Sequence, residues 1–428
     1  MALIDRTKGP EIYPIADMQL PQIRRYALRN GVPVYILDNE NLELIHFIFS
    51  LKVGIFDEDQ KHVSTFTYSL LKQSSREYSS TEIADLLAFY GVHYTVSEML
   101  NATNITISVP RNNVTKILPV IYDFLTNPLF KEENLETYKN LKIKDLEYNV
   151  KKPDVRNTQL LVHAMFGDKY TAGQLSSRDN INAVTVESMQ RFHQSTFCAE
   201  NLSIFVTGNV DDAVEDCFTQ LFSQVQNGKP TAKHENIAMP ADRSSIICEE
   251  IPGSVQSSIS LCSPSMGFLD PERMDFSILT TITGGYFGSR LMQNLREKNG
   301  YTYGVSAGSV YFGNQSLFII NSDVNIADTK AAIDACFYEL KRLQTELVDE
   351  EELETVRNYL IGESLRGVEN AVSYLKKFQY WRQYGLDEQE FRMKLQRIRN
   401  ITAEEIQALA KKHFDYNNFT QIIVGGSL

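Results

Sequence analysis

One stretch of sequence occurs twice and decides the fold. Residues 184–208 read VTVESMQRFHQSTFCAENLSIFVTG, and residues 401–425 read ITAEEIQALAKKHFDYNNFTQIIVG. Each copy begins with a helical pattern and ends in a short apolar run typical of a strand. The residues that are identical at a constant offset of 217 are Thr185/Thr402, Glu187/Glu404, Gln190/Gln407, Phe197/Phe414, Asn201/Asn418 and Gly208/Gly425.

Two further pairs of segments follow the same order at nearly the same offset. Three pairings in one order predict two homologous domains of about 210 residues each. Two copies are too few for a solenoid. The further pairs are NLETYKN at 134–140 with ELETVRN at 352–358, and Gly54…Asp57 with Gly267…Asp270.

The two domains should meet in a polar segment, SQVQNGKPTAKHENIAMPADRSS, at residues 223–245. This segment contains two prolines and no apolar periodicity, which is typical of a linker. We therefore predict an N-terminal domain at 1–222, a linker at 223–245 and a C-terminal domain at 246–428.

Helical and strand patterns are mixed within each half. They predict an α+β fold in which each domain has an antiparallel sheet with helices packed on one face. Ser80 and Thr402 are expected to cap helices, and Thr402 begins a capping box with Glu405. The expected helices are 62–73, 80–90, 112–126, 132–149, 186–197, 273–284, 327–345, 349–365 and 403–413. The expected strands are 33–39, 42–53, 104–109, 202–208, 257–262, 317–324 and 420–426.

The composition excludes several classes of protein. The 428 residues carry a formal net charge of −12, and an acidic surface repels phosphate backbones, which argues against nucleic-acid binding. No segment approaches the roughly 18 apolar residues of a membrane span, and the first residues lack the apolar core of a signal peptide. The five cysteines are scattered and form no Cys-x-x-Cys pair, as in a reducing compartment. We therefore expect a cytoplasmic protein with no membrane or nucleic-acid partner.

The histidines argue against a metal site in this chain. There are seven, and no two lie within five residues of each other. A helix that binds zinc usually presents two histidines four residues apart. We therefore expect no metal ligand here, although a site assembled from distant histidines stays open.

Two segments could carry chemistry. The run TGGYFGSRL at 283–291 contains Gly284, Gly285 and Gly288, which allow close backbone approach. It could cradle a phosphate, but no Gly-Lys-Ser/Thr follows it and it does not leave a strand. Further on, Arg296 and Tyr303 lie seven residues apart and could bind a peptide carbonyl and steady an oxyanion. The alternative is a surface arginine at a helix end and a core tyrosine.

The segment GGYFGSRLMQNLREKNGYTYGVSAG resembles the C-terminal-domain signature of the pitrilysin/insulinase family. In that family an arginine and a tyrosine seven residues apart assist catalysis, and the matching positions here are Arg296 and Tyr303. FGDKYTAG and the first repeat copy resemble the segment that closes the family's first domain. LLKQSSREYSSTEIADLLAFYGV resembles the segment after its zinc helix. The resemblance extends over nearly all of residues 20–427.

The family's zinc motif is an inverted His-x-x-Glu-His sequence on a helix, with the glutamate as general base. The resemblance places these positions at Thr65, Tyr68 and Ser69, and none of the three can do the work of the residue it replaces. His62 is the only histidine nearby. The family's third ligand is a glutamate on a later helix, where Asp145 and Glu147 lie close to the expected place.

The resemblance therefore implies a non-catalytic, activating subunit of a heterodimeric zinc metallopeptidase. A homologous partner with the zinc motif would hold the metal, and Arg296 and Tyr303 would reach across a cleft to a peptide substrate. Gly284, Gly285 and Gly288 would line that cleft or permit its closing. The segment GVHYTVSEMLNATNITISV could supply an edge strand for an extended peptide or an ordinary hairpin. The isolated chain could form a homodimer. The alternative functions are a structural or peptide-binding homologue without a catalytic role and, less favoured, a self-sufficient peptidase.

Overall fold

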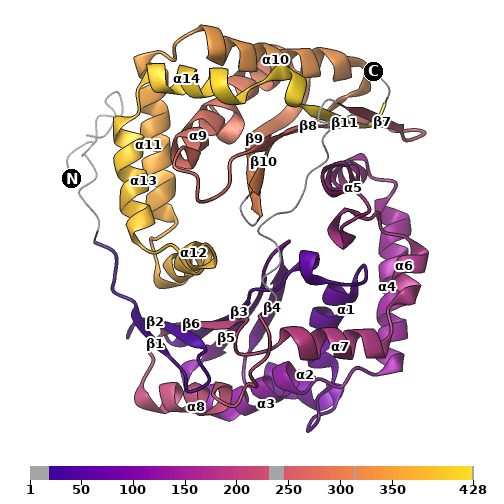
Figure 1. The fold of residues 1–428 in the computed structure, drawn as a ribbon, viewed down its shortest axis with the longest axis vertical. Coiled ribbons are helices and arrows are strands. Elements are labelled where there is room, and N and C mark those ends of the chain that lie inside the picture. Colours follow the sequence, from indigo (N-terminus) through magenta and orange to yellow (C-terminus); the bar gives the residue numbers. More distant parts are fainter. Residues whose placement is uncertain (1–18, 231–244, 313–314, 427–428) are drawn as a thin grey trace, which may run out of the picture.

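The computed structural model describes residues 19–230, 245–312 and 315–426, so most of the predicted linker lies outside the described residues. Two sheets face each other, one in each half of the molecule (Figure 1). The first sheet runs in the order β1 (Arg24–Ala27), β2 (Pro33–Asp38), β6 (Leu202–Gly208), β3 (Leu44–Leu51), β5 (Thr103–Pro110) and β4 (His93–Glu98). The second runs in the order β7 (Ile246–Glu250), β11 (Thr420–Gly425), β8 (Gln256–Ser265), β10 (Gln315–Asn325) and β9 (Thr302–Phe312).

The two sheets share one topology, as the internal repeat predicts. Apart from β1, which has no counterpart among the described residues, each strand of the first sheet has one in the same place in the second. The pairing is antiparallel except for one parallel pair in each sheet, β2 with β6 and β7 with β11. The predicted α+β class is confirmed, and the predicted antiparallel pairing holds for every other neighbouring pair of strands.

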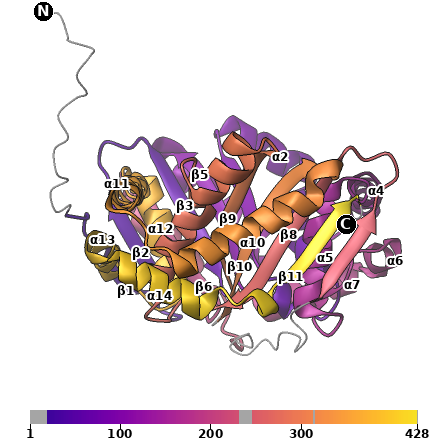
Figure 2. The same cartoon turned by 90° about the horizontal axis from the view of Figure 1, so that it is seen from above.

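Helices cover the outer face of each sheet (Figures 1 and 2). On the first sheet, Phe218 and Phe222 of α8 pack against Phe47 and Phe49 of β3. The helices of the first half are α1 (Val63–Leu70), α2 (Ser80–Phe89), α3 (Val114–Thr126), α4 (Glu132–Asn149), α5 (Pro153–Phe166), α6 (Arg178–Ala183), α7 (Val186–Thr196) and α8 (Asp212–Phe222). Those of the second half are α9 (Arg273–Thr280), α10 (Thr329–Thr345), α11 (Glu350–Arg366), α12 (Ala371–Gln383), α13 (Gln389–Asn400) and α14 (Ala403–His413).

The residues that are identical in the two repeats have the same structural roles in both halves. Thr185 caps α7 and Thr402 caps α14, each in a capping box. Gly208 and Gly425 end their strands with φ of 138° and 121°, and a Cβ at either would strike the backbone of the strand alongside. One predicted cap was wrong by one residue, because Ser79 rather than Ser80 caps α2.

Each half lends one helix to the other. Helix α5 of the first half packs on β8 and β11 of the second sheet, and α12 of the second half packs on β6 of the first (Figure 1). The inner face of each sheet is thus covered by a helix from the opposite half. The predicted packing of helices on one face holds for the outer face of each sheet, and the helix on the inner face was not predicted.

The two exchanged helices use matching polar contacts. In the second sheet, Asn157 of α5 donates to the carbonyl oxygens of Ser258 and Ile422 over 2.8 and 3.0 Å. In the first sheet, Gln379 of α12 donates to Ser50 Oγ and Asn104 Oδ1 over 2.9 and 3.1 Å. All four hydrogen bonds are at least partly buried. Each side-chain amide therefore provides hydrogen bonds to buried acceptors and fixes the position of its helix on the sheet.

Candidate peptide cleft and the altered metal motif

The three positions of the altered metal motif lie on α1. Tyr68 is fully buried, and burial raises the pKa of its phenol. Ser69 Oγ accepts a hydrogen bond of 2.8 Å from the hydroxyl of Tyr138 on α4. Burial raises the pKa of the Glu98 carboxyl at the end of β4, and the side chain of Thr65 opposes part of that rise. Each side chain is therefore engaged in the packing or hydrogen bonding of this half.

The ionisable groups around α1 include Glu58, Lys61, His62 and Lys142. Ser64 donates to Glu58 over 2.9 Å, and burial raises the pKa of the Glu58 carboxyl to about 7. His62, which precedes α1 with a φ of 75°, is largely buried, and its Nε2 has no hydrogen-bond partner among the described residues. Burial, and then the positive charges of Lys61 and Lys142, lower the pKa of His62 to about 4. Two lysines thus supply positive charge in this region.

These residues do not fit zinc. Catalytic zinc needs three protein ligands from histidine, cysteine or carboxylate, and no group of three such residues could hold a metal ion in the part of the chain that the structure describes. Asp145 and Glu147 are exposed on α4, and Glu147 forms an ion pair with Arg178. Both are therefore surface residues of α4.

The glycine run begins inside one π-helix, Thr281–Gly285, and ends just before a second, Met292–Lys298. π-helices are rare and are frequent at functional sites. A Cβ at Gly284 would lie 2.7 Å from Ala307 Cβ and 2.8 Å from Ala307 N on β9, whereas one at Gly288 would come as close only to the Tyr286 ring and the nearest contact of one at Gly285 would be at 3.2 Å. Gly284 is thus the glycine that the close approach of the run to β9 requires.

Arg296 and Tyr303 flank the turn that joins the second π-helix to β9. Gly300 lies in this turn with a φ of 66°, which favours glycine. The guanidinium of Arg296 lies 4.7 Å from the ring centroid of Phe287 in the glycine run. Tyr303 is 90% exposed, so it is not the core tyrosine of the alternative interpretation. No hydrogen bond joins the two side chains among the described residues, and their joint action stays a prediction.

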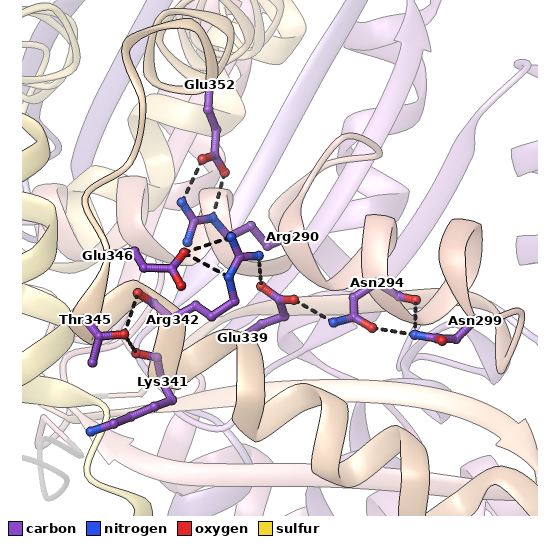
Figure 3. Close-up of polar contacts among 9 residues, drawn as sticks. All are labelled: Arg290, Asn294, Asn299, Glu339, Lys341, Arg342, Thr345, Glu346 and Glu352. Atoms are coloured by element: carbon purple, nitrogen blue, oxygen red, sulfur yellow. Dashed lines mark hydrogen bonds and ion pairs between the residues drawn. The ribbon is translucent and has the colours of Figure 1, made fainter.

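A chain of polar contacts fixes the segment that carries Arg296 (Figure 3). Arg290, near the end of the glycine run, donates to both carboxylate oxygens of Glu352 on α11 over 2.9 and 2.8 Å. Asn294 donates to the buried Glu339 of α10 over 2.6 Å, and Arg342 donates to the same carboxylate over 3.1 Å. One residue just before the second π-helix and one in its first turn are therefore tied to α11 and α10. These contacts could not be predicted from the sequence because they join segments about 45 to 60 residues apart.

A cleft of about 630 Å³ runs beside the glycine run. Its walls come from both halves of the molecule. Two exposed carboxylates, Asp154 and Asp323, line it, and no lysine or arginine does. Tyr303 itself is not part of the wall, but its neighbour Gly304 is. The remaining lining residues include Asn157, Ser260, Gly284, Gly285, Tyr286, Phe287, Met292, Ser306 and Asn321.

Comparison with known proteins identifies the family. The profile described as Insulinase (Peptidase family M16) matches residues 51–177, and that described as Peptidase M16 inactive domain matches residues 183–360. The chain belongs to the insulinase family, peptidase family M16. A relative named as an uncharacterized zinc protease of Streptomyces coelicolor is 22% identical over 408 residues, which cover 91% of this chain and 86% of that one.

Solved structures share the fold. A peptidase M16 inactive domain from Pseudomonas fluorescens has a TM-score of 0.86 at 20% identity and covers 95% of this chain and 98% of its own. The periplasmic protease PqqL from Escherichia coli has a TM-score of 0.79 at 14% identity, and the match covers 99% of this chain but 49% of that one. In the described parts of our chain, no helix combines the length and hydropathy needed to cross a bilayer.

Proposed function

We propose that this chain is the non-catalytic, activating subunit of a heterodimeric zinc metallopeptidase. The observation that carries the proposal is the contrast between the two halves. In the first half, Thr65, Tyr68 and Ser69 hold the motif positions and cannot bind zinc, while in the second half Arg296 and Tyr303 remain accessible beside a cleft. The zinc and the general base belong to a homologous partner that retains the motif.

The role proposed for Arg296 and Tyr303 is to bind the substrate backbone and stabilise an oxyanion. Guanidinium and phenol groups are hydrogen-bond donors of the kind that such sites use. The carboxylates of Asp154 and Asp323 make the cleft suited to neutral or basic peptides. The edge strand β4 offers main-chain groups for a second contact with an extended peptide.

The proposal of two combined units is in keeping with PqqL, a periplasmic protease of which this fold covers 49%. A cytoplasmic location and homodimer formation by the isolated chain are further parts of the proposal, to be checked by cell fractionation and by light scattering.

The test is to purify the chain, measure bound zinc, and assay peptide hydrolysis alone and with the zinc-motif homologue encoded beside it. We expect no stoichiometric zinc, no activity alone and activity in the mixture. Arg296→Ala and Tyr303→Phe should each lower kcat of the mixture about 10²-fold, and Lys298→Ala is the matched exposed control. Zinc and activity in the chain alone would overturn the proposal. Partner-dependent activity that neither substitution changes would keep the complex but remove the catalytic role, leaving a structural or peptide-binding subunit.

A further inference from the structure

A second cavity lies in the C-terminal half, apart from the peptide cleft. It has a volume of about 350 Å³ and shares no lining residue with the cleft. Five elements enclose it, namely α9, β9, α11, α12 and α13, which Figure 1 shows together on one side of the second half. This volume is at the lower end of the range for small-molecule sites.

The cavity has an excess of positive charge. Three cations line it, Arg273, Lys377 and Lys394, against two carboxylates, Glu363 and Glu390. Each carboxylate already has a partner, because Glu390 pairs with Arg273 and Glu363 pairs with Arg366, which lies outside the cavity. An acidic protein with a net charge of −12 has thus gathered unneutralised positive charge in one partly enclosed space.

The two lysines have no anionic partner of their own. Neither Lys377 nor Lys394 forms an ion pair or a hydrogen bond among the described residues, and Arg273 Nε is buried without an acceptor. Burial, and then repulsion by Lys377 and Arg273, lower the pKa of Lys394 to about 8, and burial also lowers the pKa of Lys377; the charge of Glu390 offsets only part of each shift. Desolvated cations without counterions are costly, so an anion entering this cavity would relieve an existing penalty.

We propose that this cavity binds a small oxyanion, a phosphate- or carboxylate-bearing metabolite, through Lys377, Lys394 and Arg273. The ammonium groups and the free guanidinium N–H would donate charge-assisted hydrogen bonds to it. The hydroxyls of Tyr311 and Tyr380 lie in the same wall and offer additional donors. Because α12 also packs on the first sheet, a bound anion stabilises the helix that joins the two halves.

The only tryptophan of the chain, Trp381, lines the cavity and reports binding directly. The full-length chain is titrated with inorganic phosphate and, separately, with citrate, at an ionic strength held constant with sodium chloride. We expect a saturable change in tryptophan fluorescence with at least one of the two anions and a rise in Tm, since a ligand that binds only the folded state stabilises it. The arm that saturates at lower concentration identifies phosphate or carboxylate as the preferred group.

Substitutions locate the site. Lys377→Met and Lys394→Met should each weaken binding about 10- to 100-fold, as expected for loss of one charge-assisted hydrogen bond. Lys394→Arg keeps the charge and should retain most of the affinity, which separates loss of the site from loss of the fold. Lys376→Met is the control on the same helix, because Lys376 is exposed and does not line the cavity. The inference is overturned if neither anion exceeds the chloride control, or if affinity is unchanged in both methionine variants.

Discussion

The ion pair between Arg290 and Glu352 should contribute measurably to the stability of the C-terminal half. The Arg290 side chain is only 9% exposed and that of Glu352 is 21% exposed (Figure 3). Removing one partner of a buried pair typically costs about 3–5 kcal/mol because the other charge stays buried. Arg290 Nη1 already lacks a partner among the described residues, so no second acceptor replaces the lost carboxylate. Since water reaches Glu352 in part, we expect Glu352→Ala to lower the free energy of unfolding by about 2–3 kcal/mol.

The measurement is urea unfolding followed by the fluorescence of Trp381, which is buried in the same half. The double variant Arg290→Met/Glu352→Ala removes both charges and is compared with Arg290→Met and Glu352→Ala alone. It should lose less stability than the sum of these two single variants, with a coupling of about 1–3 kcal/mol. The control is Asp334→Ala, because Asp334 pairs with Lys330 at a fully solvated position and should change stability by less than about 0.5 kcal/mol. Single variants that behave like this control, or strictly additive effects, would refute the reasoning.

Three further outcomes are expected. Gly284→Ala should lower Tm, with a cost of about 1–3 kcal/mol from overpacking against Ala307, whereas Gly304→Ala, with open space at its Cβ, should not; equal melting curves would contradict this. Glu58→Gln should raise the free energy of unfolding by about 1–3 kcal/mol near pH 8 but not near pH 4, measured by circular dichroism. The carboxyl pKa is raised from 4.5 to about 7 by burial, so the folded state binds more protons in this range and the wild type loses stability as pH rises through it; a gain that is independent of pH would argue against it. A protease site inserted within residues 231–244 should be cut without separating the halves on gel filtration, because α5 and α12 each pack on the opposite half; separate elution would show that the linker holds them together.

Local signals made much of the fold predictable. The cap at Thr402, the helical periods and the short apolar strands are encoded within a few residues, so their positions agree with the structure to within a few residues. The repeat then predicted a second sheet of the same kind. The parallel pairing of β2 with β6 was not predictable in this way, because it joins strands about 170 residues apart.

The two exchanged helices were missed for a different reason. Helix α12 buries Tyr374, Phe378 and Trp381 at helical spacing, but this spacing does not say which sheet the helix packs on. Helix α5 likewise buries Asn157 on the same side as Leu161 and Met165. Periodicity can indicate a buried helix face, but the packing of each helix on the opposite half depends on contacts between distant segments.

The candidate site was also predictable only in part. The helix that carries Thr65, Tyr68 and Ser69 lies where the sequence predicted it, and Arg296 and Tyr303 lie on either side of the turn at Gly300. The hydrogen bond from Tyr138 to Ser69, the positive charge of Lys142 and the cationic cavity around Lys394 depend on contacts between distant segments. Only the folded chain brings them together.

The exchange of α5 and α12 has the form of a domain-swapped homodimer whose two copies were joined end to end. In such an ancestor, symmetry would have placed the same site in both subunits. In this chain the two places are the end of α1, the first α-helix after β3, and the glycine run that follows α9, the first α-helix after β8. Two identical subunits must carry the same residues at both places, whereas the two halves of one chain can differ. Here one place is a packed helix end with a buried Tyr68, and the other is a glycine run that lines a cleft.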